Sequence, residues 1–201
     1  DVAGNGSADC RGEDERATNA SRKGPAGLAL DMSGSLYIAD RGNHRIRKVT
    51  AEGVISTVAG GTKAGYAGDF GVATQAAIKS PMDVAIDGDG NLYISDSGNN
   101  RIRKVDASGV ISTIAGSGSR KYDGDDQPAI DAGMTPAGIA LDGAGGLLVA
   151  DTRNHRIRLI DLQSGMISTL AGTGKRGFGG DGDLAQGARL SSPWGVTVST
   201  T

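Results

Sequence analysis

One stretch of ten residues occurs three times in this chain of 201 residues, and it constrains the fold more than any other feature. It reads DRGNHRIRKV from Asp40, DSGNNRIRKV from Asp96 and DTRNHRIRLI from Asp151. Four prolines keep the same register with spacings of 56, 55 and 57 residues: Pro25, Pro81, Pro136 and Pro193. A fixed period of this kind indicates repeated structural units that stack on their neighbours.

Each repeat contains four short segments typical of strands, which in the first repeat are GLALD, LYIAD, RIRKV and VISTVAG. Turns rich in glycine, aspartate and asparagine separate the segments, and this is the chemistry of β-hairpins. Four short strands joined by tight turns predict a four-stranded antiparallel sheet. Such sheets repeated at this period are typical of the blades of a β-propeller. No segment shows the 3.6-residue apolar period of a helical solenoid.

The composition agrees with a fold built from small β-sheets. The chain has 34 glycines, and only 3% of its residues are aromatic, so the core must come from valine, isoleucine, leucine and alanine. A formal net charge of -2 argues against a global electrostatic preference for nucleic acid or an anionic membrane. No apolar run approaches the roughly 20 residues that span a bilayer.

The phrase NHRIRKV, with LYIAD before it and ISTVAG after it, resembles the NHL repeat, a class of β-propeller. The resemblance covers nearly the whole chain and implies a ring that is commonly six-bladed and most often serves recognition. We therefore expect an all-β fold, a β-propeller of four-stranded antiparallel NHL-type blades. The ring is expected to be incomplete, with three full blades and a single strand at each end of the chain.

The repeat boundaries divide the chain, one propeller segment over residues 1–201, into five parts. We expect the last strand of a preceding blade with its connecting loop, three blades, and the first strand of a following blade, at residues 1–24, 25–80, 81–135, 136–192 and 193–201. These residues are expected to be a window on a longer propeller. The alternative is that two copies join into a composite ring, whose junction sheets would lack two strands.

Arg45 and Arg47 share one face of their strand, opposite Ile46, and a bend near Lys48 is expected because Val49 breaks the alternation. The structural interpretation places the arginines along the blade surface, with their stems on apolar area and their heads paired with carboxylates or carbonyls of the next blade. The alternative is a basic stripe for RNA phosphates. The structural interpretation is preferred because every blade carries the pair, so no nucleic acid partner is expected.

The residues around the arginines are also predicted to be structural. Asp40 is expected to accept backbone N–H bonds in the following turn, and Asn43 to tolerate a left-handed conformation. His44 and His155 occupy a position where the middle repeat has Asn100, so hydrogen bonding is preferred over zinc. The structural repeat positions are Asp40, Asn43, Arg45, Arg47, Asp96, Asn99, Arg101, Arg103, Asp151, Asn154, Arg156 and Arg158.

The long loops between blades repeat an acid after a glycine: Glu13, Asp69, Asp125 and Asp181. We expect this acid to cap a short helical turn that holds an alanine pair such as Ala73 and Ala76. The alternative is calcium or carbohydrate binding, with calcium at Asp125 or Asp181, because neighbouring acids also offer oxygen ligands. Aromatic rings recur nearby, at Tyr66, Tyr122 and Phe178, and are expected to pin the loop by an apolar contact, with Cys10 as a small substitute.

These observations favour a non-catalytic binding or protein-interaction propeller, part of a larger secreted or cell-surface protein, over an enzyme. One alternative is a propeller lyase or calcium-dependent lactonase whose ligands lie in blades outside these residues. The other is a structural repeat segment that self-assembles. We expect no cofactor, no catalytic residue, no membrane insertion, and as partner another protein, further blades or a second copy. Candidates on the ligand face are Arg41, Arg153, Asp123, Asp125, Asp126, Asp181 and Asp183.

Overall fold

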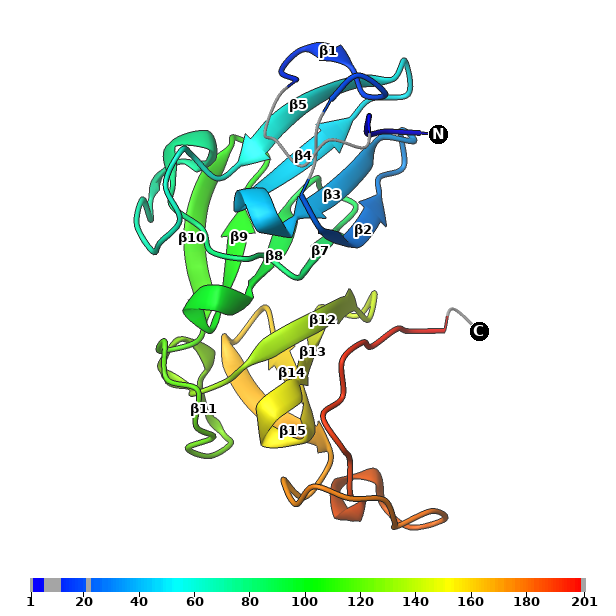
Figure 1. Ribbon diagram of the computed structural model, residues 1–201. Coiled ribbons are helices and arrows are strands. Elements are labelled where there is room, and N and C mark those ends of the chain that lie inside the picture. Colours follow the sequence, from blue (N-terminus) through cyan, green and yellow to red (C-terminus); the bar gives the residue numbers. More distant parts are fainter. Residues whose placement is uncertain (1, 6–11, 21–22, 200–201) are drawn as a thin grey trace. The chain divides into compact units, whose positions relative to one another are not determined.

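The computed structural model describes residues 2–5, 12–20 and 23–199 (Figure 1). The chain divides into two compact units, one of residues 1–99 and 103–112 and the other of residues 100–102 and 113–201. The described residues form β-strands and single-turn 3-10 helices, so the all-β fold predicted from the sequence is confirmed. Among these residues no helix is long and apolar enough to cross a membrane.

The strands form three antiparallel sheets, and each sheet has five strands. The first has the order β1-β5-β4-β3-β2, with β1 (Glu15–Arg16), β2 (Pro25–Leu30), β3 (Leu36–Asp40), β4 (Arg45–Val49) and β5 (Val54–Ala59). The second has the order β6-β10-β9-β8-β7, with β6 (Gly71–Val72), β7 (Asp83–Ile86), β8 (Leu92–Asp96), β9 (Arg101–Val105) and β10 (Val110–Ala115). The third has the order β11-β15-β14-β13-β12, with β11 (Gln127–Pro128), β12 (Pro136–Leu141), β13 (Gly146–Asp151), β14 (Arg156–Asp161) and β15 (Met166–Ala171).

Each sheet therefore contains the four strands predicted for a blade and gains a fifth from the preceding connector. The added strands β1, β6 and β11 are two residues long and pair with the start of the outermost predicted strand. Glu15 pairs with Ile55, and Gln127 pairs with Ile167 at the corresponding place in the third sheet. The connector is thus fastened to the outer edge of the blade that follows it.

Short 3-10 helices occupy two places in each repeat. One follows the second predicted strand, as η1 (Arg41–Asn43), η3 (Ser97–Asn99) and η5 (Thr152–Asn154). The other lies in the connector, as η2 (Ala73–Gln75), η4 (Ala129–Asp131) and η6 (Ala185–Gly187).

Aspartates close the tight turns between strands. The Oδ1 atom of Asp31 accepts backbone N–H bonds from Ser33 at 3.0 Å and Ser35 at 2.8 Å. Gly34 in this turn has a φ of 82°, in the region that glycine tolerates without steric cost. A carboxylate that binds the backbone ahead of it stabilises the turn locally, so the chain reverses without help from a neighbouring blade.

The bend expected near Lys48 lies elsewhere. The register of β4 with β5 shifts between Ile46 and Arg47, which pair with Ala59 and Thr57 and leave Val58 as the extra residue. The third sheet has the same irregularity between Ile157 and Arg158. This β-bulge turns the end of the outer strand, and the alternation along β4 itself is regular.

The core of the first unit lies between its two sheets. The first sheet contributes Tyr37, Ala39, Ile46 and Ala59, the connector contributes Ala73, Ala76 and Ile78, and the second sheet contributes Val84, Leu92, Ile94, Val105 and Ile111. All are buried. Burying one aliphatic side chain of this size stabilises the fold by about 1.5–3 kcal/mol, so small side chains in close packing replace the aromatic residues that the chain lacks.

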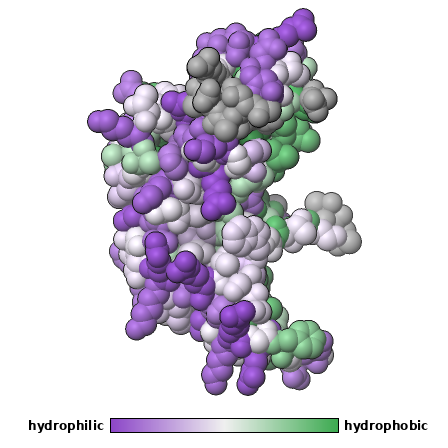
Figure 2. Space-filling view, viewed as in Figure 1, coloured by the Kyte–Doolittle hydropathy of each residue, from purple (hydrophilic) through white to green (hydrophobic). Residues whose placement is uncertain are grey.

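The strand β2 has no such cover. Leu28 and Leu30 are 58% and 66% exposed, whereas Val84, at the position in β7 that corresponds to Leu28, is 3% exposed. Hydrophobic residues gather beside β2 in the space-filling view (Figure 2). This side of the first blade is therefore an exposed apolar surface. The corresponding side of the second blade, at β7, is covered by the first blade.

The terminal segments make the hydrogen bonds of the repeat positions to which the sequence aligns them. The N–H of Gly4 donates to the Ala17 carbonyl at 2.8 Å, as Gly60 donates to Ala73 at 3.0 Å. At the other end Gly138 donates to the Trp194 carbonyl at 2.8 Å. Neither segment forms a strand ladder within the described residues.

Candidate functional site

The second arginine of each RIR triplet lies inside the protein. The side chains of Arg47, Arg103 and Arg158 have no exposed surface. The expectation that these arginines lie along the blade surface is therefore wrong for this position. A guanidinium taken out of water costs several kcal/mol unless charged or polar groups surround it, so each needs partners from the fold.

The principal partner is the acid that recurs in the connector. Nη2 of Arg103 lies 2.6 Å from Oδ1 of Asp69, and Nη2 of Arg158 lies 2.9 Å from Oδ1 of Asp125. In the first blade the corresponding distance from Arg47 to Glu13 is 3.4 Å. The acid was expected to cap a helical turn, but η2 and η6 have no side-chain cap hydrogen bond. Its recurrence reflects the ion pair instead.

A second acid lies close to the guanidiniums of Arg103 and Arg158. Oδ2 of Asp96 lies 3.5 Å from Nη1 of Arg103, and Oδ1 of Asp96 accepts the backbone N–H of Lys79 at 2.7 Å. The amide of Asn99 donates to the same carboxylate at 2.8 Å. Burial raises the pKa of Asp96, and the hydrogen bonds from Asn99 and Lys79 oppose this rise. The pKa of Asp151 is raised for the same reason.

Two details of the predicted turn are corrected by this geometry. Asp40, Asp96 and Asp151 bind the backbone N–H of the preceding connector rather than that of the following turn. The left-handed residue is not the asparagine but the next one, His44 at φ 57° and Asn100 at φ 55°. The asparagines are used as amide donors to the buried aspartates.

The tyrosines complete the network. The hydroxyl of Tyr66 donates to Oδ2 of Asp69 at 2.9 Å, and its ring centre lies 5.1 Å from the Arg103 guanidinium. Tyr122 makes the same contacts with Asp125 and Arg158. The ring covers a cation, which a purely apolar pin would not explain. Phe178 lacks the hydroxyl and is 86% exposed, so it pins nothing. Cys10 lies outside the described residues.

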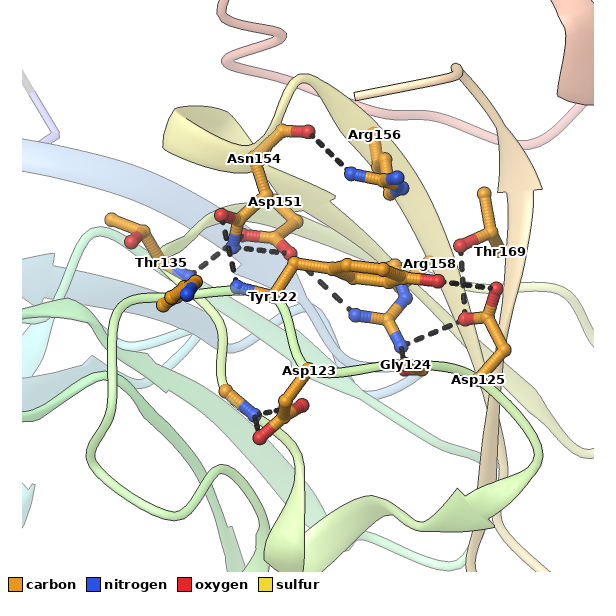
Figure 3. A network of polar contacts seen from close by, with 12 residues as sticks. Tyr122, Asp123, Gly124, Asp125, Thr135, Asp151, Asn154, Arg156, Arg158 and Thr169 are labelled. Carbon is orange, nitrogen blue, oxygen red and sulfur yellow. Dashed lines mark hydrogen bonds and ion pairs between the residues drawn. The ribbon is translucent and has the colours of Figure 1, made fainter. Parts of the chain in front are cut away.

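The third sheet shows the network at its fullest (Figure 3). The Thr169 hydroxyl donates to Oδ1 of Asp125 at 2.9 Å, the atom that also receives Arg158. Arg156, the first arginine of the triplet, lies with its guanidinium 3.7 Å from the centre of the Tyr122 ring. It donates to the carbonyls of Asn154 and Thr173 at 3.1 and 3.0 Å. The predicted pairing with carbonyls is found here, but both carbonyls belong to the arginine's own repeat and not to the next blade as predicted.

A pocket of about 440 Å³ opens beside this network. Its walls include Tyr122, Asp125, Asp126, Arg156, Ser168, Thr169, Gly172, Thr173 and Gln186. Many of these groups already hydrogen-bond within the protein, and Gln186 donates to the Thr169 carbonyl at 2.9 Å. A ligand in the pocket would therefore have to replace existing hydrogen bonds in order to bind most of these polar groups.

The histidines act as hydrogen-bond acceptors. Nδ1 of His44 accepts the backbone N–H of Ser80 at 3.0 Å, and Nδ1 of His155 accepts that of Ser192 at 3.0 Å. In the middle repeat Asn100 donates to the Gly118 carbonyl at 3.0 Å. The hydrogen-bonding role predicted for this position is confirmed.

The candidate acids of the connectors do not converge. Asp125 is engaged by Arg158, Tyr122 and Thr169, and Asp123 accepts the backbone N–H of Gly133 at 2.9 Å. Asp126, Asp181 and Asp183 are exposed. In the part of the chain that the structure describes, no three His, Cys, Asp or Glu side chains are grouped as metal ligands.

Arg41 and Arg153 lie in η1 and η5 and are exposed. In an antiparallel blade these 3-10 turns and both ends of the connectors lie at one end of the strands, which we call the connector edge. The tight turns between the first and second and between the third and fourth predicted strands lie at the other end, which we call the hairpin edge. The two candidate arginines thus belong to the connector edge.

One repeated contact, between an aspartate, a tyrosine and a lysine, was not predicted from the sequence. The Tyr37 hydroxyl donates to Asp31 at 3.3 Å, and Nζ of Lys48 lies 5.3 Å from the Tyr37 ring centre. Tyr93, Asp87 and Lys104 repeat the arrangement in the second blade. The signal was the constant six-residue spacing from aspartate to tyrosine. In the third repeat Leu148 and Leu159 replace the ring and the cation, so the contact is structural and dispensable.

The chain matches known families over most of its length. A model of the teneurin NHL domain matches residues 4–66 and 61–123, and a model of the NHL repeat matches residues 134–158.

Similar proteins include NHL repeat-containing protein 2 from Homo sapiens, 31% identical over 158 residues, which are 73% of this chain and 22% of that protein. Protein SUPPRESSOR OF QUENCHING 1, chloroplastic, from Arabidopsis thaliana is 33% identical over 70% of this chain and 14% of its own length. Teneurin-4 from Homo sapiens is 37% identical over 44% of this chain and 4% of its own length. The chain thus spans only a small part of these relatives.

Solved structures share the fold. A Bacteroides thetaiotaomicron protein of unknown function superposes with a TM-score of 0.67 at 20% identity, over 86% of this chain and 42% of that one. A streptogramin B lyase superposes with a TM-score of 0.55 at 19% identity, over 89% of this chain and 46% of that one.

Proposed function

Because the chain belongs to the NHL-repeat family of β-propeller proteins, we propose that it is a non-catalytic interaction segment that presents its connector edge to another protein. One observation carries this proposal. The repeated acids, arginines and histidines, which are the side chains that catalysis would need, make ion pairs and hydrogen bonds within the blades. Examples are the ion pair of Arg103 with Asp69 and the hydrogen bond of His44 with Ser80. The charged side chains left exposed lie on turns and loops of a rigid scaffold, where proteins commonly place recognition.

Site-specific photo-crosslinking in the full-length protein, in its native cell, tests the proposal. A photoreactive residue at position 41 or 153 labels the connector edge, and one at position 89 or 144 labels the hairpin edge as a matched control. We expect a discrete cross-linked protein from the connector edge alone. Equal labelling from both edges, or none from position 41 or 153, would overturn the proposal.

The exposed apolar side of β2 supports a second partner. Leu28 is the counterpart of Val84, which is buried between the two sheets of the first unit, and Leu30 is the counterpart of Ile86, which is partly buried there. A further blade is therefore the natural occupant of this surface. That blade belongs to the same polypeptide or to a second copy. Sedimentation of the isolated chain distinguishes them, since a second copy gives a concentration-dependent dimer and a further blade of the same polypeptide leaves a monomer.

A propeller enzyme is the second candidate, and the pocket beside Asp125 and Arg156 is the observation in its favour. Incubating the protein with lactones and with a cyclic depsipeptide, in the presence of magnesium or calcium, tests it. Turnover that disappears with the substitution Arg156→Ala would make the chain an enzyme. We expect no turnover.

For location, we propose an extracellular or periplasmic position, because the matching family model describes the NHL domain of teneurins. The chloroplastic relative shows that the family is not confined to one compartment. Protease digestion of intact source cells checks the proposal: an external propeller is cut or shed, and an internal one is protected until lysis.

A further inference from the structure

The two ends of each blade carry opposite charge. The hairpin edge consists of six tight turns at residues 31–35, 50–53, 87–91, 106–109, 142–145 and 161–165, and none contains lysine or arginine. Its acids are Asp31, Glu52, Asp87, Asp89, Asp106, Asp142 and Asp161. Hydrogen bonds within the turns lower the pKa of Asp31 and Asp106, so these carboxylates are ionised at neutral pH.

The connector edge of the first unit is basic. Lys23, Arg41, Lys63 and Lys79 are all exposed there. The Lys23 carbonyl accepts the N–H of Gly42 at 2.7 Å, which holds Lys23 beside the turn that carries Arg41. The Lys79 carbonyl accepts the N–H of Gly98 at 2.9 Å and fixes Lys79 at the next turn.

The start of the same connector is tied to this edge as well. The amide of Asn99 donates to the Gly65 carbonyl at 2.6 Å, two residues after Lys63. Both ends of the connector therefore converge on one 3-10 turn, each with a lysine pointing to solvent.

The second unit repeats the pattern with different residues. Arg120, Lys121 and Arg153 are exposed, and the amide of Asn154 donates to the Arg120 carbonyl at 3.1 Å. Lys175 and Arg176 occupy the start of the next connector. The lysines and arginines do not all occupy equivalent positions in the repeats, yet the connector edge is positively charged in both units.

Few acids offset this charge at the connector edge. Asp96 and Asp151 are buried against Arg103 and Arg158, so they neutralise internal cations rather than the surface. Asp83 accepts the N–H of its neighbour Val84 at 2.9 Å. Asp123 accepts the backbone N–H of Gly133. On the 3-10 turns and at the connector ends, the exposed lysines and arginines thus outnumber Asp83 and Asp123, although acids elsewhere in each unit balance them.

We propose that the connector edge of each unit docks an acidic segment of a partner protein, an inference that rests on the proposed interaction function. The overall net charge of -2 provides no global attraction for anions, so attraction must be local and short-ranged. Clusters of four or five exposed cations match a short run of glutamates or aspartates.

An acidic protein segment fits better than single-stranded nucleic acid. Proteins that bind single strands combine cations with aromatic faces on which bases stack. Here the rings of Tyr66 and Tyr122 lie against the guanidiniums of Arg103 and Arg156. These rings are already in use, and the lysines that dominate the first unit make point-charge contacts suited to carboxylates.

Fluorescence anisotropy with the full chain tests the inference. The probes are a labelled peptide of repeated Glu-Glu-Gly, the matching Gln-Gln-Gly peptide, and an RNA oligonucleotide of equal charge. We expect binding of the glutamate peptide alone, weakened roughly tenfold or more between about 50 mM and 500 mM salt because screening shortens the range of the attraction.

Charge-reversal variants locate the binding surface. Arg41→Glu and Arg153→Glu are each expected to weaken peptide binding about fivefold, since rim charges act through long-range attraction. Arg16→Glu, an exposed arginine on β1 away from this edge, is the matched control and should change binding less than about twofold. Circular dichroism melting checks that all three variants fold.

The peptide, RNA and cross-linking results test the inference and the proposed function separately. Peptide binding that is indifferent to Arg41→Glu and Arg153→Glu, or equal for the glutamine peptide, overturns the inference. Tighter binding of the RNA through the same residues overturns the choice of partner class. A cross-linked partner that survives high salt and Arg41→Glu overturns this inference while the proposed function stands. Glutamate-peptide binding without any cross-linked protein supports the charge preference and leaves the proposed function overturned.

Discussion

Nη2 of Arg103 and Oδ1 of Asp69 lie 2.6 Å apart, joining a strand of the second blade to the connector that precedes it. The guanidinium has no exposed surface, and the carboxylate side chain is 22% exposed. The pair explains why a connector acid and a strand arginine recur together in all three blades. It links the longest irregular segment of the repeat to the centre of the sheet.

Removing the acid alone should therefore be costly. We predict that Asp69→Ala destabilises the chain by about 3 kcal/mol, since it leaves a buried cation without its nearest partner. Arg103→Met should cost at least as much, because it removes the cation between Asp69 and the fully buried Asp96 and leaves both carboxylates without their charge partner. The double variant should be no less stable than Arg103→Met alone. Urea unfolding of the four proteins measures the coupling.

The control for this experiment is Asp181→Ala. Asp181 holds the same connector position as Asp69 but is exposed, so its loss should change stability by less than about 0.5 kcal/mol. If Asp69→Ala is equally mild, the ion pair contributes nothing and the buried arginine is satisfied by other groups.

A second prediction concerns the ring over the cation. Tyr122→Phe removes the hydroxyl that donates to Asp125 at 3.0 Å and should cost about 0.5–1.5 kcal/mol. Phe178→Ala, at the corresponding position of the next connector, should have almost no effect because the ring is 86% exposed. Thermal unfolding compares them, and a larger loss for Phe178→Ala would show that this connector is packed differently from the other two.

The repeat period, the turn residues and the strand patterns sufficed to predict the blades, because each blade is built from local hairpins. The same reasoning could not place Arg47, Arg103 and Arg158. An arginine in a strand is normally a surface residue, and its burial depends on an acid 34 residues earlier in the chain, as for Arg103 and Asp69. The 56-residue recurrence of Gly-acid pairs was visible, but a local helix cap was the simpler explanation.

The third prediction concerns how the stability of the protein depends on pH, to which Asp31 and Asp96 contribute in opposite directions. The hydrogen bond from the Ser33 hydroxyl is the main cause that lowers the pKa of Asp31 from 3.8 to about 2. A lowered pKa in the folded state means that the ionised form is favoured by folding. This stabilisation is present above pH 3.8 and is lost as the pH falls towards 2. Asp31→Asn should therefore be destabilising at neutral pH and neutral near pH 2.

Asp96 should behave in the opposite sense, since burial raises its pKa above 3.8. Its contribution to stability is complete below pH 3.8 and declines as the pH rises through the folded-state value. Melting curves of the protein, Asp31→Asn and Asp96→Asn over the acid range separate the two effects. Parallel curves for all three proteins would contradict both assignments.

The fourth prediction compares two positions in the same register of neighbouring blades. Val84→Asp puts a charge into the core of the first unit, where Val84 is 3% exposed, and should unfold that unit because a buried unpaired charge costs several kcal/mol. Leu28→Asp, at a residue 58% exposed, should be tolerated by the isolated chain. In the assembled or longer protein it should become destabilising. Tolerance there too would mean that nothing covers β2.

The last prediction concerns calcium at the connector acids. A cation at Asp125 would have to displace the Arg158 guanidinium from Oδ1 and the Tyr122 hydroxyl from Oδ2, so binding should be unfavourable there. We expect neither added calcium nor a chelator to shift the melting temperature. A site filled at about a hundredfold excess over its Kd would add about 2.7 kcal/mol of stability, which is easily detected. Asp181 and Asp183 are exposed, so a shift abolished by Asp181→Asn but not by Asp125→Asn would place calcium at the last connector and contradict the expectation of no cofactor.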